Sequence, residues 1–484
     1  MNTTTRILIV GTGFSGLGLA MRLKASGVED FLLIEKAQDV GGTWRENTYP
    51  GAACDVKSHL YSFSFAPKSN WSRVFSAQPE IEQYLRDCAD SYNIRQFIRF
   101  GEEMKSARYD ESKCEWTITS ANGNSFTAQF LVLATGPLHL PNIPDIKGLE
   151  NFEGPKFHSA KWNHQFELKH KKVAVIGTGA SAIQFVPEIQ KQVDQLFLFQ
   201  RSAPWVIPKP DGAIAPWQQQ LYEKIPLIRE WYRQLIYWMN EVQVLGFTSQ
   251  RGFLRFAEKL VRRHLKRRIK DKVLLEKLLP NYEMGCKRIL LSNNYYPALQ
   301  QPNVEVITDK ILSVGNHYIE SADGQKRNID AIIFGTGFHV TDAFQFADIT
   351  GRNATPLKEV WKNGAEAFLG TTVHGFPNMF MLIGPNTGLG HNSMVYMIEA
   401  QIHLIMGIFR QMQRQSNHSV EVKHDVQDRF NRMLDKKSIG TVWNSGCNSW
   451  YLNQQGRSAA VWPDFTFKFR AATEKIRSED YIWN

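Results

Sequence analysis

The chain of 484 residues has few cysteines and lacks a long apolar run. Its cysteines are odd in number, widely spaced and without a Cys-x-x-Cys pair, which argues against a disulfide framework or a zinc site. No apolar segment is long enough to span a bilayer, and residues 1–6 show no signal-peptide pattern. We therefore expect a cytoplasmic protein without disulfides or bound metal, in which all five cysteines are free: Cys54, Cys88, Cys114, Cys286 and Cys447.

The rest of the composition is that of an ordinary globular protein. Hydrophobic residues make up 43% and charged residues 21%, and the length predicts two to three domains. The formal net charge is +10, which suits either an acidic partner or anionic cofactors. No segment has the pattern of a helix-turn-helix, a zinc finger or another nucleic-acid module, so we expect no nucleic-acid partner.

Two segments, residues 6–16 and 172–182, have nearly the same pattern. Each is an apolar run followed by a glycine turn and a helix-like stretch, and a second apolar run follows at residues 31–34 and 196–199. This order is typical of a βαβ unit that binds a dinucleotide. The apolar runs are continuous rather than alternating, which predicts parallel strands covered by helices on both faces.

The first glycine turn is Gly11-x-Gly13-x-x-Gly16. Such glycines allow a tight turn, a close approach of the backbone to a pyrophosphate, and close packing of helix and strand. Glu35 ends the following strand, 24 residues after Gly11, where an acid would hold the ribose hydroxyls of a cofactor.

The second turn, Gly177-x-Gly179-x-x-Ala182, precedes a strand that ends in Arg201 and Ser202 instead of an acid. A guanidinium at this place suits the 2′-phosphate of NADP. The other interpretation of Arg201 is an ordinary surface arginine.

Different residues at the two strand ends predict two different cofactors, FAD in the first unit and NADPH in the second. The predicted fold is α/β, with two Rossmann-like dinucleotide-binding domains and a helical insertion in the NADP domain. We expect the FAD domain at residues 1–140 and 341–484, the NADP domain at 141–207 and 284–340, and the insertion at 208–283.

The insertion is predicted from apolar residues at helical spacing. It also carries a basic run at residues 262–270. This run is either a solvated helix face or a surface for an anionic membrane. The apolar residues are Leu227, Trp231, Leu235, Trp238, Phe253, Phe256 and Leu260.

Residues 152–163 carry a family resemblance. Phe152-x-Gly154-x-x-x-His158-x-x-x-Trp162 resembles the fingerprint of class B flavin monooxygenases, and Trp162 resembles the Baeyer–Villiger branch of that family. Asn163 stands where the family usually has proline or aspartate. The resemblance implies a conformational role for His158 and Trp162, which would couple domain motion to the position of the nicotinamide.

A second signature begins at Gly41 and contains Gly42, Trp44, Tyr49 and Asp55. It is similar to the pattern GGxWxxxxYPGxxxD of Baeyer–Villiger monooxygenases. The resemblance implies that Gly42 and Trp44 contact the flavin cofactor, and that Asp55 lies near the flavin ring.

Three further segments resemble the same family. Lys287 and Arg288, followed by Asn294-Tyr-Tyr, resemble the segment of the active-site arginine. Arg288 would be that arginine, and Lys287 would reach the 2′-phosphate beside Arg201. Trp450 resembles a tryptophan that covers the nicotinamide ribose, and Asn386 a residue in contact with the flavin.

The resemblance implies a monooxygenase that uses FAD, NADPH and O2 and acts through a C4a-peroxyflavin. A ketone would become an ester or lactone, with Arg288 stabilising negative charge and Asp55 orienting Arg288. Three alternatives remain open at this point: a class B enzyme that oxygenates sulfur or nitrogen, an FAD disulfide reductase, and a non-catalytic redox sensor. The two signatures with Asp55 and Arg288 favour the carbonyl chemistry.

Overall fold

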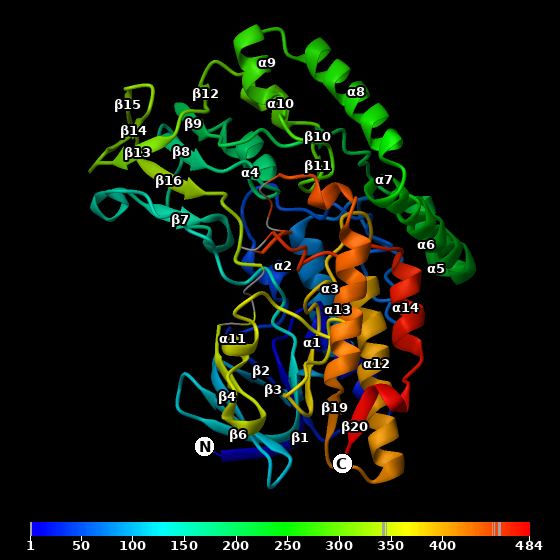
Figure 1. Ribbon diagram of the computed structural model, residues 1–484. Helices are drawn as coiled ribbons and strands as arrows, with labels where there is room; N and C mark the ends of the chain where they lie inside the picture. The colour runs from blue at the N-terminus through cyan, green and yellow to red at the C-terminus, as the bar shows by residue number, and fades with distance from the viewer. Residues whose placement is uncertain (1, 341–343, 345, 448, 450, 454–455) are drawn as a thin grey trace.

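The structure is a computed structural model, and it describes residues 2–340, 344, 346–447, 449, 451–453 and 456–484. Figure 1 shows two sheets in different parts of the molecule, with a row of helices along one outer edge. Each sheet has a buried apolar core on both of its faces. This is the α/β fold predicted from the two βαβ patterns.

The first sheet is built from two distant parts of the chain, because β18 from the C-terminal part pairs with β6 from the N-terminal part. β1 pairs in parallel with β2 and β6, and it begins before the predicted apolar run because Asn2–Thr5 pair with Ser125–Ala128. The strand order is β17 (Asp348–Thr350), β4 (Met104–Asp110), β5 (Glu115–Ser120), β6 (Ser125–Leu133), β1 (Asn2–Val10), β2 (Phe31–Glu35) and β3 (Ile98–Phe100), with β18 (Met379–Met381) beside β6.

Apolar faces of several helices cover the first sheet. Leu17 of α1, Leu85 of α3 and Ile402 of α12 belong to the same buried cluster as Ile9 and Phe130 of the sheet. On α12 the buried side chains of Ile398, Ile402, Ile405 and Phe409 are three or four residues apart, so burial of one face holds the helix on the sheet. We call the part of the molecule around the first sheet the first half, and the part around the second sheet the second half. The helices of the first half are α1 (Phe14–Ala25), α2 (Thr43–Glu46), α3 (Gln78–Ser91), α11 (Leu357–Val360), α12 (Met394–Gln415), α13 (His424–Ser438) and α14 (Thr466–Glu474).

The second sheet is parallel throughout its five strands. α4 (Ala182–Ile189) and α10 (Tyr295–Leu299) pack on it. The strand order is β12 (Val304–Ile307), β9 (Gln195–Phe199), β8 (Lys172–Ile176), β16 (Ala331–Phe334) and β7 (Lys156–His158). β7 places residue 158 at the end of an edge strand, directly beside the turn that follows β16.

Three small sheets complete the described strands. β10 and β11 pair in parallel, and the other two sheets are antiparallel. Their bounds are β10 (Val206–Ile207), β11 (Leu290–Leu291), β13 (Ile311–Val314), β14 (Tyr318–Ser321), β15 (Lys326–Asn328), β19 (Val420–Val422) and β20 (Tyr481–Trp483).

The predicted insertion is helical, and it lies between β10 and β11. The apolar residues that predicted these helices are exposed, from Leu227 to Leu260. α6 is held instead by its other face, where Ile236 and Tyr237 pack against Leu60. The helices are α5 (Pro216–Lys224), α6 (Pro226–Glu241), α7 (Val244–Thr248), α8 (Arg251–Arg268) and α9 (Lys272–Leu278).

Candidate functional site

The first glycine turn leaves no room for side chains on its inner side. Gly11 has φ +104°, and a Cβ there would lie 2.8 Å from the carbonyl oxygen of Ala134. A Cβ on Gly16 would lie 1.9 Å from the carbonyl oxygen of Gly11, and a Cβ on Gly42 2.9 Å from the Cα of Gly13. The two segments thus approach each other as bare backbone where α1 begins, and the first turn of α1 holds no acidic residue. This arrangement fits an anionic pyrophosphate.

Glu35 lies at the end of β2, buried, but its carboxylate already has donors within the protein. Oε2 accepts hydrogen bonds from the backbone N–H (3.0 Å) and the hydroxyl (2.8 Å) of Thr12. Oε1 accepts from the N–H of Ala37 at 3.0 Å and from the guanidinium of Arg45 at 3.1 Å. A cofactor ribose would therefore compete with these donors, of which the Thr12 hydroxyl and the Arg45 guanidinium belong to side chains.

The second glycine turn repeats the first. Gly177 has φ +105°, and a Cβ there would lie 2.4 Å from the carbonyl oxygen of Gly335. A Cβ on Gly179 would have only ordinary contacts, the nearest at 3.7 Å from the same oxygen. α4 follows without an acidic residue in its first turn, so this helix start is also suited to an anion.

Three predicted NADP residues come together beside this turn. Lys287 donates a hydrogen bond from Nζ to the Ser202 hydroxyl at 2.9 Å. Burial and the nearby positive charge of Arg201 lower the pKa of Lys287. Arg201 is exposed, and within the described residues neither cation has a carboxylate at ion-pair distance. Two neighbouring cations without a counter-ion fit a phosphate group.

Arg288 and Asp55 form an ion pair across 233 residues of sequence. Both Nε (2.9 Å) and Nη2 (2.7 Å) of Arg288 donate to Oδ2 of Asp55. Both side chains keep part of their surface exposed, 34% for Arg288 and 28% for Asp55. The carboxylate raises the pKa of Arg288, so the guanidinium is charged at every relevant pH. The structure therefore offers a fixed positive charge that solvent or a ligand can reach.

Gln184 on α4 joins the Asp55 segment to the second sheet. Its amide oxygen accepts from the Tyr49 hydroxyl at 3.0 Å and from the N–H of Ala53 at 3.3 Å, and its amide nitrogen donates to the carbonyl of Ala53 at 2.9 Å. Residues 49–53 belong to the first half and Gln184 to the second, so this side chain fixes one half against the other near Asp55. Sequence reasoning missed Gln184, because a lone glutamine on a helix carries no motif.

Cys286 and Cys447 form a disulfide, with their Cα atoms 6.3 Å apart. The expectation of a chain without disulfides is wrong for this pair. Spacing along the chain could not reveal it, because 161 residues separate the two cysteines. The bond ties the segment of Lys287 and Arg288 to the C-terminal segment that contains Trp450, a residue that lies outside the described part of the chain.

The remaining cysteines are free thiols: Cys54, Cys88 and Cys114. Cys54 is buried next to Asp55, and burial raises its pKa, so it stays a neutral thiol rather than a reactive thiolate. A disulfide reductase needs a redox pair beside the flavin, and the one thiol adjacent to Asp55 is unreactive in this environment.

His158 and Trp162 occupy the junction of the two halves. His158 is buried, and burial lowers its pKa, which keeps the ring neutral. Its Nδ1 accepts from the N–H of Ala160 at 3.1 Å, whereas Nε2 has no partner among the described residues. The Trp162 ring packs against Phe157 and Phe185, 5.3 and 5.4 Å between centroids. These contacts are structural, and they leave one donor or acceptor of His158 available.

Two predicted flavin contacts have contrasting environments. Asn386 is buried with φ +57°. Its amide nitrogen donates to the carbonyls of Ser458 (2.7 Å) and Val461 (3.3 Å), and its Oδ1 is an acceptor with no partner in the described part of the chain. Trp44 instead donates from Nε1 to the Tyr61 hydroxyl at 3.2 Å. A buried acceptor without a donor is costly, so Asn386 fits a residue that awaits a ligand donor.

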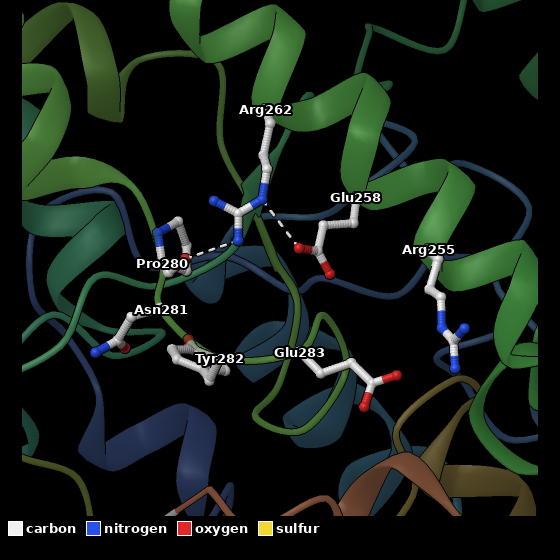
Figure 2. A pocket seen from close by; sticks show the side chains of 7 residues that line it. All are labelled: Arg255, Glu258, Arg262, Pro280, Asn281, Tyr282 and Glu283. Atoms are coloured by element: carbon white, nitrogen blue, oxygen red, sulfur yellow. Dashed lines mark hydrogen bonds and ion pairs between the residues drawn. The ribbon is translucent and has the colours of Figure 1, made fainter.

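A groove of about 650 Å³ lies between α8 and residues 280–283, which precede the segment of Lys287 and Arg288. Figure 2 shows Arg262 turned into it, with Nη2 donating to the carbonyl of Pro280 at 2.9 Å and Nε paired with Glu258 at 2.9 Å. The amino group of Lys287 lies 4.7 Å from the ring centroid of Tyr282, one of the residues that line the groove. The groove thus lies within the predicted insertion, and its wall at residues 280–283 directly precedes the segment of Lys287 and Arg288.

Comparisons with known proteins agree with this geometry. Residues 8–232 match the family model described as pyridine nucleotide-disulphide oxidoreductase. A Baeyer–Villiger monooxygenase of Pseudomonas aeruginosa is 47% identical over 98% of this chain and 91% of its own length. Two solved structures superpose on nearly the whole chain: an oxidized steroid monooxygenase bound to NADP (28% identity, TM-score 0.89, 99% of both chains) and the OTEMO complex with FAD and NADP (26%, 0.92, 100% of both chains).

The family-model match covers the two glycine turns, and the full-length relative extends the similarity through the segments of Arg288 and Asn386. A relative of this identity and coverage shows the family directly. The chain belongs to the Baeyer–Villiger monooxygenases.

Proposed function

We propose that this protein inserts one oxygen atom from O2 next to the carbonyl of a ketone, with FAD as its flavin and NADPH as its reductant. The product is an ester or a lactone. The observation that carries the proposal is the ion pair of Arg288 with Asp55, because it provides a permanent positive charge beside the junction of two nucleotide-binding halves.

The described residues fit both cofactors. The backbone cradle of Gly11, Gly13 and Gly42 and the buried acceptor of Asn386 would hold FAD. The Gly177 turn would hold the NADPH pyrophosphate, and Arg201 with Lys287 its 2′-phosphate. When bound, FAD supplies the transfer of electrons from NADPH to O2 and the activated oxygen that attacks the carbonyl.

Arg288 performs the electrostatic part of the reaction. Attack on a ketone places negative charge on the carbonyl oxygen, and a guanidinium that is already oriented stabilises that charge without reorganising. Asp55 fixes the guanidinium plane through two hydrogen bonds to one oxygen. The remaining N–H groups of Arg288 are available to the reacting oxygen atoms.

This arrangement favours carbonyl chemistry over the oxygenation of sulfur or nitrogen. A sulfide or an amine attacks an electrophilic oxygen, and no negative carbonyl oxygen forms that would need a fixed cation. The oriented Arg288–Asp55 pair would have no evident task in such an enzyme. We therefore expect ketones to be turned over faster than sulfides.

The test is a panel of cyclic ketones, linear ketones and sulfides, incubated with the FAD-loaded protein, NADPH and ¹⁸O2. Mass spectrometry should show esters or lactones that contain one labelled oxygen atom, with one NADPH consumed for each product. Incorporation into sulfides alone would contradict the proposal. NADPH oxidation that yields only hydrogen peroxide with every ketone would also contradict it, whereas the absence of NADPH oxidation coupled to oxygen uptake would favour the redox-sensor alternative.

A further inference from the structure

The insertion carries a large exposed apolar surface. Of the 20 large hydrophobic residues that are exposed in the described chain, 14 lie between Trp217 and Val273. Ile228, Trp231, Leu235 and Trp238 on α6, with Val242 directly after its end, are three or four residues apart and therefore share one face. Trp231 is the most exposed of these, at 71%. We call this row the α6 stripe.

The α6 stripe is not an unpacked core face. The opposite face of α6 is fixed to the first half: Arg233 donates to the carbonyl of His59 at 2.6 Å, and Tyr237 bonds to the Thr466 hydroxyl at 3.0 Å. Glu241 at the end of the helix is fully buried and accepts from Asn392 at 2.6 Å. α6 is thus held in one orientation, and that orientation presents its tryptophans to the outside.

α8 also has an exposed apolar row, and basic residues extend this row. Phe253, Phe256 and Leu260 form an exposed row at spacings of three and four, opposite the buried Leu254 and Leu265. The row continues in the next two turns as Arg263 and Arg267. Figure 1 shows α8, α7, α6 and α5 following one another along one outer edge of the molecule.

This edge carries a segment of high net positive charge. Residues 251–272 contain ten Lys or Arg and two acidic residues, a net charge of +8 against +10 for the whole chain. Arg251 and Arg262 pair with Glu283 and Glu258 on the inner side of α8. The other eight basic residues are exposed and form no ion pair within the described chain: Arg255, Lys259, Arg263, Lys266, Arg267, Arg268, Lys270 and Lys272.

We propose that this edge is a docking surface for an anionic lipid membrane. Exposed tryptophan and phenylalanine beside a lysine- and arginine-rich helix are the features of helices that lie in a membrane interface. The aromatic and aliphatic side chains would enter the headgroup region, and the basic residues would contact acidic headgroups. In the described residues, no helix is long and apolar enough to cross a membrane.

Charge decides between a membrane and a second copy of the chain. A two-fold contact through this edge would bring the +8 segment of one copy close to the same segment of the other. Like charges placed together oppose such an interface. An anionic bilayer complements both properties of the surface, its apolar rows and its positive charge.

The docking surface is connected to the candidate site through the inner side of the same helices. Phe247 of α7 stacks on Trp443 with 5.6 Å between ring centroids. Phe247 and Leu254 also fill the space beside Gly285, next to the disulfide-bonded Cys286. The helices that would meet lipid on one side therefore pack on the segment of Arg288 on the other.

The experiment is co-sedimentation of the full-length, FAD-loaded protein with vesicles of phosphatidylcholine alone or mixed with phosphatidylglycerol. We expect binding to the mixed vesicles, little binding to the neutral ones, and release by salt. Lys266→Glu, Arg267→Glu and Arg268→Glu together should lower the partition coefficient by about tenfold or more. FAD content and circular dichroism check that each variant folds.

The matched control reverses the charge of three exposed lysines outside the insertion: Lys113→Glu, Lys169→Glu and Lys362→Glu. This variant has the same net charge as the first but should keep its binding. A second pair, Trp231→Ser with Trp238→Ser, should lose quenching of tryptophan fluorescence by brominated lipid. Its control is Leu312→Ser with Val360→Ser, at exposed positions outside the insertion.

Three results would overturn the proposal. One is the absence of binding to the mixed vesicles. Another is equal loss of binding in the charge reversal and its control, which would reduce the effect to net charge. The third is a wild-type dimer that the Trp231/Trp238 pair converts to monomers without any vesicle binding, because the surface would then lie between two copies.

Discussion

The two glycine turns have nearly the same backbone, yet the strands beside them end in opposite charges. Gly11 and Gly177 have φ values of +104° and +105°, and in each turn a carbonyl oxygen from a neighbouring strand end excludes a side chain. Glu35 is buried and hydrogen-bonded, whereas Arg201 is exposed and has no ion pair among the described residues. We therefore propose that the turn sets where an anionic cofactor lies, and that the strand end sets which cofactor it is.

The groups proposed for catalysis belong to neither half alone. Asp55 comes from the first half and Arg288 from the segment that enters the second, and Gln184 joins the two halves nearby. We therefore expect the largest losses of activity from substitutions at the residues that join the two halves.

Replacing Arg288 should have the largest effect. Arg288→Ala removes the fixed charge, and we expect ester formation to fall by about a hundredfold or more, as when an oxyanion donor is lost. NADPH oxidation should continue and yield hydrogen peroxide, because the two glycine turns are unchanged. The measurement is product formed per NADPH consumed, by gas chromatography and peroxide assay.

Arg288→Lys is the matched control for this variant. It keeps the charge but loses the planar fork that bonds Asp55 twice, so we expect activity between those of the wild type and Arg288→Ala. Unchanged ketone turnover in Arg288→Ala would remove Arg288 from the mechanism.

Breaking the disulfide should have the next largest effect. Cys447→Ser releases the C-terminal segment from the segment of Arg288, and a cross-link across a long loop is worth about 2–4 kcal/mol of unfolding free energy. Urea unfolding of the variant and of the wild type with and without dithiothreitol measures this difference. The control, Cys114→Ser, changes a free cysteine and should leave both curves unchanged. A wild type that binds two equivalents of a thiol reagent at these positions without reductant would contradict the cross-link.

The βαβ units could be predicted because their signals are local. A continuous apolar run, a glycine turn and the residue at the next strand end lie within about one βαβ unit, and the structure has strands and turns at these places. The cluster of Arg201, Ser202 and Lys287 was also within reach, since the strand end marked Arg201 and Ser202 and the family resemblance marked Lys287.

Features that depend on distant residues could not be predicted. Glu241 would be assigned to a solvated helix face, yet it is fully buried because Asn392 and Thr466, far along the chain, supply hydrogen bonds. The disulfide is hidden by its 161-residue separation. The apolar spacing of α6 predicted a helix correctly, but it did not reveal that Trp231 faces outward.

Removing the charge at the second strand end should have a smaller, selective effect. Arg201→Ala should raise the KM for NADPH by about tenfold, the value of one charge-assisted hydrogen-bond site, while Lys287 still holds part of the phosphate. The KM for NADH, which has no 2′-phosphate, should change little. Steady-state kinetics with both nucleotides measure the ratio.

Arg414→Ala, at an exposed arginine without an ion pair among the described residues, is the control and should change neither KM. Equal changes in the KM for NADPH and for NADH in Arg201→Ala would show that Arg201 does not bind the 2′-phosphate. The comparison between Glu35 and Arg201 would then no longer explain the choice of cofactor.

The smallest effect concerns the contact between the first half and the insertion. His59 lies against the rings of Tyr222 and Tyr232, and burial together with Arg229 and Arg233 lowers its pKa to about 4. The unfolded chain, with an ordinary histidine pKa of about 6.5, takes up the proton first. Stability is therefore lost as the pH falls from about 6.5 towards 4, by about 1 kcal/mol between about pH 7.5 and pH 5.5. Urea unfolding across this range should show a shallower loss for His59→Asn than for the wild type, whereas His317→Asn, at an exposed histidine, should follow the wild type. Parallel curves for His59→Asn and the wild type would mean that the insertion does not shield the His59 ring from water. The first half and the insertion would then be separated by solvent at this place.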